Sequence, residues 1–277
     1  MDFNFKKRFG QNFLTYFPEE MYPDVTQVEG VFHVVEIGPG TGALTKPLLT
    51  FFTEKQLLVE YHCVDIDPEA LTELQSELAV HEFDRNRITM QFHNQDVLTV
   101  NVSEFVNKPG SIWILGSLPY NISKKIINWA FENLSRLRED IIPVPMKFII
   151  QKEVAENYIS KVPQADFLSH VANLFGKETS ILKILPPGSF RPAPKVTSVV
   201  IKMAPLKMNF EKYEELDRCA NFIHQCYGYR RKKIKFALRK TLSKEKLQIL
   251  ENNSPKLLEK RSEEIETNDF IRLFENI

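Results

Sequence analysis

The sequence predicts an α/β fold: a mostly parallel, Rossmann-like sheet with an antiparallel last strand, followed by a small C-terminal all-α domain. Three observations favour it. Apolar runs of strand length alternate with helical segments from residue 31 to residue 150, as in a parallel sheet covered on both faces. The runs at 181–185 and 196–203 lack a helix between them and are expected to be antiparallel neighbours. Beyond Pro205, apolar residues recur only at helical spacing.

Each element follows from the local pattern. Strands are expected at 31–37, 57–67, 88–92, 111–115 and 146–150, and helices at 43–52, 69–80, 123–134, 153–160 and 167–175. Pro68 favours the start of the second helix, because proline fits the first helical turn. Between residues 15 and 30, Pro18 and Pro23 permit only short helical turns. The expected domains are residues 1–203 and 204–277.

Composition excludes several classes of protein. The chain has 277 residues, is 43% apolar and has no net charge, so it can bury a full core. No run approaches the roughly 18 apolar residues of a membrane span, and the first residues lack the apolar centre of a secretion signal. The three cysteines and six histidines show neither C-x-x-C nor H-x-x-x-H spacing. We therefore expect a cytoplasmic protein without a metal site or a membrane association.

Charge is unevenly distributed along the chain. From Ala204 onward there are 16 Lys and Arg against 12 Asp and Glu, a net charge of +4. The rest of the chain therefore has a net charge of −4. Nine basic residues and one acid, Glu245, lie between Gly228 and Lys246. Such a patch indicates contact with phosphates, and the alternative is an ordinary solvated helix face.

A glycine-rich turn follows the first strand. The apolar run Val34 to Ile37 contains the acid Glu36 and passes into Gly38, Gly40 and Gly42. Glycine can adopt positive φ and lets a ligand approach the main chain. The spacing does not fit G-x-G-x-x-G, because residue 43 is Ala, so a plain tight turn remains an alternative.

Polar residues also follow the next three strands, at the edge where parallel sheets bind ligands. Asp65 ends the second strand and Asp96 follows the third, while Ser117-Leu118-Pro119-Tyr120 follows the fourth. Asp65 could accept hydrogen bonds from ribose hydroxyls, and Asp96 could accept one from an exocyclic amine. Either could instead be a solvated strand end or a helix cap. Together they indicate an adenosine-containing ligand and favour a class I methyltransferase sheet over a dinucleotide dehydrogenase.

The tetrapeptide 117–120 suits methylation of an adenine amine. That nitrogen is a poor nucleophile because its lone pair is delocalised into the ring, so an enzyme must hold the amine near tetrahedral geometry. The Ser117 hydroxyl and the Leu118 carbonyl, kept free by Pro119, could each accept an N–H, while Tyr120 stacks on an unstacked base. Phe190, in the proline-rich loop 186–194, could cover its other face.

Two structural alternatives remain for these residues. The tetrapeptide could be an ordinary strand-to-helix turn capped by Asn121 or Ser123. Phe190 could simply pack under the sheet.

Seven segments, in order, carry a resemblance to a known family: 9–14 (FGQNFL), 35–42 (VEIGPGTG), 95–97 (QDV), 118–123 (LPYNIS), 151–155 (QKEVA), 190–198 (FRPAPKVTS) and 230–232 (RRK). They resemble the small-subunit ribosomal RNA adenine N6-dimethyltransferases from about residue 6 to residue 242. The resemblance implies S-adenosylmethionine as methyl donor and dimethylation of two adjacent adenines in a hairpin loop near the 3′ end of small-subunit RNA. It implies that the donor is held by Asn12, Leu14, Gly38, Asp65, Asp96 and Ser117, with Gly40 beside them, and that RNA is held by Arg230, Arg231, Lys232 and Lys233.

Three departures from the family pattern bear on activity. Ser117 replaces the usual Asn, residues 164–169 lack the usual Tyr-Gly, and Pro18 and Pro23 interrupt a usual helix. The expected protein is a monomeric enzyme acting on small-subunit RNA, in a partly assembled subunit. The alternative is an RNA-binding assembly or transcription factor with weak or lost methyl transfer.

Overall fold

The computed structural model describes residues 12–277, which form two compact units. Among the described residues, the first unit includes everything up to Lys152 together with 180–207; the second comprises 153–179 and 208–277. Residues 153–179, expected in the first domain, therefore group by contact with the helical unit. The basic arm expected at residues 6–8 lies outside the described residues.

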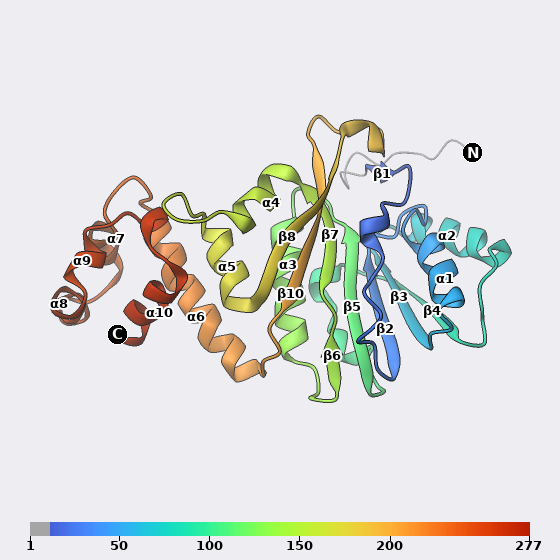
Figure 1. The fold of residues 1–277 in the computed structure, drawn as a ribbon, viewed down its shortest axis with the longest axis horizontal. Coiled ribbons are helices and arrows are strands. Elements are labelled where there is room, and N and C mark those ends of the chain that lie inside the picture. Colours follow the sequence, from blue (N-terminus) through green and yellow to red (C-terminus); the bar gives the residue numbers. More distant parts are fainter. Residues whose placement is uncertain (1–11) are drawn as a thin grey trace. The chain divides into compact units, whose positions relative to one another are not determined.

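The first unit contains an eight-stranded sheet with the order β4-β3-β2-β5-β7-β10-β8, in which β6 also pairs with β5 (Figure 1). The strands are β2 (Val31–Ile37), β3 (Val59–Asp65), β4 (Ile88–Asn94), β5 (Gly110–Ser117), β6 (Ile141–Pro143), β7 (Met146–Gln151), β8 (Gly176–Leu185) and β10 (Ser198–Pro205). Strands β2 to β7 pair in parallel, and β10 is antiparallel to β7. The predicted mostly parallel sheet with an antiparallel last strand is confirmed.

Helices cover this sheet, and among the longer ones α2 begins at a side-chain cap. The longer ones are α1 (Thr45–Glu54), α2 (Pro68–Val80) and α3 (Ser123–Ser135); η2 (Glu19–Met21), η3 (Val97–Thr99), η4 (Val102–Glu104) and η5 (Pro187–Ser189) are single 3₁₀ turns. Asp67 caps α2 by accepting a hydrogen bond from the backbone N–H of Glu69, and Pro68 occupies its first turn.

The core on one face of the sheet is apolar and aromatic. Phe32 and Val34 of β2 and Tyr61 and Cys63 of β3 pack with side chains of α1 and α2, including the fully buried Phe52. Because parallel strands are buried on both faces, β2 is a continuous buried run without alternation.

A small two-stranded sheet joins segments far apart in the sequence. β1 (Phe13–Leu14) pairs with β9 (Phe190–Arg191) in antiparallel register, and Leu14 lies opposite Phe190. The Thr15 backbone N–H and hydroxyl both donate to the Ser189 carbonyl oxygen, at 2.9 and 3.0 Å. Strands of two residues have no detectable periodicity, so the sequence could not predict this pairing.

The second unit is helical apart from the first residues of β8. It contains α4 (Lys152–Ile159) beyond its first residue, α5 (Phe167–Phe175), α6 (Phe210–Tyr227), α7 (Ile234–Thr241), α8 (Lys244–Asn253), α9 (Pro255–Leu258), η6 (Ser262–Glu264) and α10 (Thr267–Glu275). The long helix α6 contacts α5, α7 and α10. At their junction His170 is hydrogen-bonded to Thr267 and to Tyr227. The predicted C-terminal helical region is confirmed, and no helix among residues 12–277 combines the length and apolar character of a membrane span.

Candidate active site

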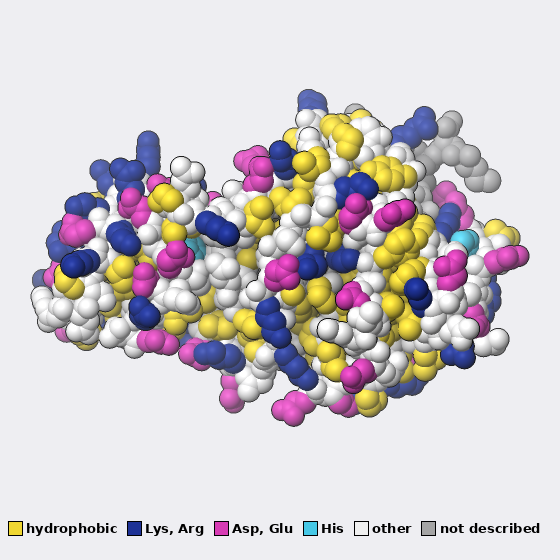
Figure 2. All heavy atoms as spheres, viewed as in Figure 1, with side chains coloured by type: hydrophobic (Ala, Val, Ile, Leu, Met, Phe, Trp, Pro, Cys, Tyr) yellow, Lys and Arg dark blue, Asp and Glu magenta, His cyan; other side chains and the backbone are white. Residues whose placement is uncertain are grey.

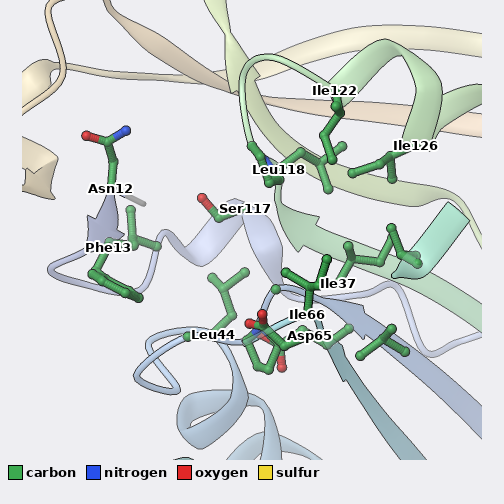
Figure 3. A pocket seen from close by; sticks show the side chains of 18 of the residues that line it. Asn12, Phe13, Ile37, Leu44, Asp65, Ile66, Ser117, Leu118, Ile122 and Ile126 are labelled. Atoms are coloured by element: carbon green, nitrogen blue, oxygen red, sulfur yellow. The ribbon is translucent and has the colours of Figure 1, made fainter. Parts of the chain in front are cut away.

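A cavity of about 240 Å³ lies in the first unit, beyond the carboxyl ends of β2, β3, β4 and β5. It brings together every donor-binding and catalytic residue that the sequence predicts: Asn12, Leu14, Gly38, Gly40, Asp65, Asp96, Ser117, Leu118, Pro119, Tyr120 and Phe190. Asn12 and Phe13 lie on one side of the cavity, and Leu118, Ile122 and Ile126 lie on another (Figure 3). The Ser117 hydroxyl points into the space between these two groups (Figure 3).

The glycine turn forms one wall of the cavity. Gly38, Gly40 and Gly42 all have left-handed backbone conformations, with φ of 65°, 53° and 79°. A Cβ on Gly40 would lie 2.8 Å from the Phe13 ring, so the turn packs directly against β1. At Gly38 the only neighbour within 4 Å of such a Cβ, among residues 12–277, is the Ser117 carbonyl oxygen, at 3.9 Å. A side chain there would occupy space that the cavity offers to a ligand.

Glu36 stabilises the glycine turn through its side chain, a role that was not recognised in the sequence. Its carboxyl group is buried and accepts hydrogen bonds from the Thr45 hydroxyl at 2.7 Å and from the Tyr61 hydroxyl at 2.6 Å. Burial raises the pKa of Glu36 to about 7, although both hydrogen bonds oppose the shift. The group thereby links β2 to β3 and to the start of α1. An acid next to the last residue of a mostly apolar strand was the signal for it.

Asp65 lies at the end of β3, where a donor ribose would be expected. Burial raises the pKa of its carboxyl group to about 6, and nearby backbone N–H groups, including that of Gly40, partly offset this. One of its oxygens also accepts a hydrogen bond from the Asp67 backbone N–H at 2.9 Å. Near pH 7 the group is therefore an ionised acceptor held in place beside the glycine turn.

Donor binding is expected to weaken as the pH falls below 6. The ionised Asp65 is the better acceptor for ribose hydroxyls, and with a pKa of about 6 it becomes protonated as the pH falls through that value. We expect the dissociation constant for S-adenosylmethionine to be about tenfold higher at pH 5 than at pH 8. Calorimetric titrations across this range would measure the change. Asp65→Asn should bind weakly with little dependence on pH, and a wild-type profile in that variant would contradict the assignment.

Another part of the cavity wall combines the carboxylate of Asp96 with the apolar side chains of Ile66 and Val97. The Asp96 side chain accepts a hydrogen bond from the Leu98 backbone N–H at 3.0 Å, so it caps η3 while also lining the cavity. Ile66 lines the cavity although its side chain is 51% exposed, and Val97 lies nearby. An exposed apolar side chain beside a carboxylate suits the flat face and amine of a purine, and the sequence analysis had not singled out Ile66.

The turn after β5 is fixed at both ends. The Leu118 backbone N–H donates to the Ile149 carbonyl oxygen of β7 at 3.0 Å, and the Tyr120 hydroxyl shares a hydrogen bond with the buried Ser198 hydroxyl at 2.7 Å. Within residues 12–277 the Leu118 carbonyl oxygen accepts no hydrogen bond. Helix α3 begins after Ile122 without a side-chain cap, so the alternative of a turn capped by Asn121 or Ser123 does not describe this structure.

Phe190 was expected either to cover the target base or to pack under the sheet, and its position has features of both. It lines the cavity, and it is only 4% exposed and belongs to the hydrophobic core cluster. Its pairing with Leu14 in the β1–β9 sheet brings the N-terminal segment to the cavity.

The four predicted RNA-binding residues lie in the second unit, in the turn between α6 and α7 and not on a helix face. Basic side chains gather over this turn (Figure 2). Arg230 is paired with Glu263 at 2.9 Å and Asp166 at 3.6 Å, and Lys233 is paired with Glu259. Within the described part of the chain, Arg231 and Lys232 have no acidic partner. Counting partners among residues 12–277 only, the turn contains two paired and two unpaired cations.

Comparison with known proteins identifies the family to which this site belongs. The model of the family described as ribosomal RNA adenine dimethylase matches residues 2–277. The chain belongs to the ribosomal RNA adenine dimethylase family. The predicted resemblance is confirmed.

Two curated relatives and one solved structure extend this result. Proteins named ribosomal RNA small subunit methyltransferase A are 33% identical over 277 residues in Sulfurihydrogenibium sp. (97% of this chain, 95% of the relative) and 33% identical over 247 residues in Nitrosospira multiformis (87% and 85%). The fold is similar to that of a dimethyladenosine transferase from Plasmodium falciparum, with a TM-score of 0.65 and 22% identity, covering 87% of this chain and 88% of the other.

Membership in the dimethylase family settles the class of reaction. The protein is an S-adenosylmethionine-dependent methyltransferase that acts on adenines of ribosomal RNA. The class I methyltransferase fold predicted from the sequence is also confirmed.

Proposed function

We propose that this protein transfers methyl groups to N6 of two adjacent adenines in a hairpin loop near the 3′ end of small-subunit ribosomal RNA. It would act in the cytoplasm, as a monomer, on a partly assembled small subunit during ribosome maturation. The observation that carries the proposal is the turn 117–120, which presents a hydroxyl, an aromatic ring and a carbonyl oxygen that accepts no hydrogen bond from the described residues, all at one cavity. The names of the curated relatives, which refer to the small subunit, support this choice of RNA.

The residues lining the cavity fit S-adenosylmethionine. When bound, this compound supplies an electrophilic methyl group. Asp65 would accept hydrogen bonds from its ribose, Asp96 would accept one from its adenine amine, and Ile66 would pack on the adenine ring. Asn12, Leu14, Gly38, Gly40 and Ser117 would hold the methionine end.

The turn after β5 would prepare the target amine. The Ser117 hydroxyl and the Leu118 carbonyl oxygen would each accept one N–H of the adenine, which draws the lone pair out of conjugation and orients the nitrogen. The Tyr120 ring, held by Ser198, would stack on the base, and Phe190 would cover its other side. A base in this position must first leave its stack, as in single-stranded loops.

Methyl transfer to intact small subunits tests the proposal. Purified protein would be incubated with radiolabelled S-adenosylmethionine and small subunits from a strain that lacks the modification. We expect label in the small-subunit RNA and none in large subunits. Donor binding without label in RNA would instead favour the RNA-binding assembly or transcription factor that the sequence left open.

Replacing Ser117 by asparagine tests the most important departure from the family pattern. The asparagine amide oxygen can accept the same N–H and reaches further than the serine hydroxyl. We expect Ser117→Asn to retain or raise the transfer rate, and Ser117→Ala to lower it about tenfold or more, because the amine loses an acceptor. Single-turnover rates with small subunits would measure both. A serine that contributes nothing would give equal rates for Ser117→Ala and the parent protein.

The turn between α6 and α7 provides a matched test of RNA binding. Arg231 and Lys232 are free to pair with phosphates, whereas Arg230 must first leave Glu263 and Asp166. We expect the double variant Arg231→Ala, Lys232→Ala to weaken binding of small-subunit RNA and to reduce the salt slope by one to two. Arg230→Ala should have a smaller effect. Filter binding at several salt concentrations would compare them, and an unchanged slope in the double variant would indicate a solvated surface only.

A further inference from the structure

One face of the sheet carries buried histidines where apolar residues are the rule. His33 of β2 lies directly opposite Glu60 of β3 in the parallel register, and His62 follows Glu60 on the same face. His33 is 0% and His62 is 1% exposed. The spacing of histidines along the chain could not reveal this group, because its members come from adjacent strands.

The hydrogen bonds of His33 determine which of its nitrogens is free. Nε2 lies 3.0 Å from the Lys108 carbonyl oxygen, which can only accept, so Nε2 carries the proton. Nδ1 of His33 is buried and has no hydrogen-bond partner among the described residues. Nδ1 therefore presents a lone pair, and it faces a Glu60 carboxylate oxygen at 3.3 Å. Two acceptors this close are favourable only with a proton or a metal ion between them.

His62 has an unused nitrogen in the same group. Its Nδ1 is 3.1 Å from Nε2 of His93, and its ring stacks on Phe105. Its Nε2 is buried and has no hydrogen-bond partner among the described residues. Whichever ring carries the shared proton, Nε2 of His62 lacks a hydrogen-bond partner among the described residues. A buried polar atom without a partner lowers the stability of the fold. If His62 donates to His93, Nε2 presents a lone pair.

We propose that His33, Glu60 and His62 form a binding site for a divalent transition metal, with Zn²⁺ as the best match. One ring nitrogen of each histidine and one carboxylate oxygen of Glu60 lie within 4.8 Å of one another. Two imidazoles and a carboxylate are a ligand set suited to Zn²⁺, with water completing the coordination. Tetrahedral zinc with bonds of about 2.0–2.2 Å places its ligand atoms about 3.4 Å apart, which matches the 3.3 Å between His33 Nδ1 and the Glu60 oxygen. Glu60, whose side chain is 12% exposed, is the most exposed of the three ligands.

The surroundings of the three residues resemble the outer shell of a metal site. The Lys108 carbonyl and His93 orient the two imidazoles, as second ligands commonly do for metal-binding histidines. The Lys108 ammonium group is paired with the other oxygen of Glu60, and its side chain is 59% exposed, so it can move into solvent when the metal enters. Lys108 thus competes with the metal for Glu60.

The site is separate from the methyl-transfer cavity, since none of its three residues lines that cavity. It would link β2 to β3. Its expected effect is on stability rather than on the chemical step, because a ligand that binds only the folded state stabilises that state.

Zinc titration of the metal-stripped, full-length protein tests the proposal. Against a chromophoric competitor we expect one Zn²⁺ per chain with a dissociation constant below about 10 µM. The midpoint of thermal unfolding should rise by about 5 °C at a hundredfold excess over that constant. Co²⁺ in place of Zn²⁺ should give visible absorption bands of a nitrogen- and oxygen-ligated site. Absence of stoichiometric binding would overturn the proposal.

Variants assign the ligands independently of activity. Glu60→Gln and His62→Gln should each weaken zinc binding at least 100-fold. Lys108→Met should strengthen it several-fold, because the competing cation is removed. His224→Gln, at an exposed histidine on α6, is the matched control and should bind normally. If His62→Gln does not fold, the Glu60→Gln and Lys108→Met pair decides the matter. Binding that is unchanged in Glu60→Gln would place the metal elsewhere and contradict the site.

Discussion

Replacing Tyr120 with alanine is expected to lower methyl transfer about 100-fold or more while leaving binding of S-adenosylmethionine nearly unchanged. The ring lines the cavity beside Ser117 and Leu118, and its hydroxyl is hydrogen-bonded to Ser198. Stacking of a base on an aromatic ring contributes about 1–3 kcal/mol, and misplacement of the amine by an ångström adds a further loss of rate. Single-turnover kinetics with small subunits would measure the change.

Tyr120→Phe separates the ring from the hydroxyl. This variant keeps the stacking surface and loses only the hydrogen bond to Ser198. We expect a rate within about tenfold of the parent protein, because one neutral hydrogen bond contributes about 1 kcal/mol. Equal rates for Tyr120→Ala and the parent protein would contradict the proposed mechanism. A large loss in both variants would assign the main role to the hydroxyl.

Replacing Gly38 with alanine is expected to weaken donor binding about 100-fold. Gly38 has a φ of 65°, which costs an alanine about 1–2 kcal/mol, and the added Cβ would enter the donor cavity beside the Ser117 carbonyl oxygen. The first effect destabilises the folded turn that forms the cavity wall, and the second obstructs the ligand directly. Calorimetric titration with S-adenosylmethionine would measure the dissociation constant, and circular dichroism would show that the fold is retained.

Gly188 offers a matched control for that substitution. A Cβ at Gly188 would have no atom of the described residues within 4 Å, and the residue is not in a left-handed conformation. Gly188→Ala should therefore bind the donor normally. If Gly38→Ala also bound the donor normally, the glycine turn would be a structural feature only, which is the alternative that the sequence left open.

The sheet and the edge that binds ligands could be predicted from the sequence because both follow from periodicity. Strands β3, β4 and β5 each end in a polar residue, and the carboxyl ends of these parallel strands and of β2 meet at one edge. For the same reason Asp65, Asp96 and Ser117 could be grouped although they are far apart in the chain. Their roles in donor and RNA binding remain predictions.

Other parts of the site depend on contacts between segments that no local pattern encodes. The pairing of β1 with β9 involves two residues on each side. The partners of Glu36, Arg230 and His33 lie on other elements, so their hydrogen bonds and ion pairs could not be foreseen. Ile66 was missed because an apolar residue at a strand end has no distinctive spacing.

Mass analysis of the RNA product shows directly whether the protein dimethylates two adjacent adenines of small-subunit RNA. Small subunits lacking the modification would be incubated with the protein and S-adenosylmethionine, and the 3′ fragment of their RNA would be digested and sequenced by mass spectrometry. We expect two adjacent adenines, each heavier by two methyl groups, within one hairpin loop. An unmodified fragment, or methyl groups on a base other than adenine, would contradict it.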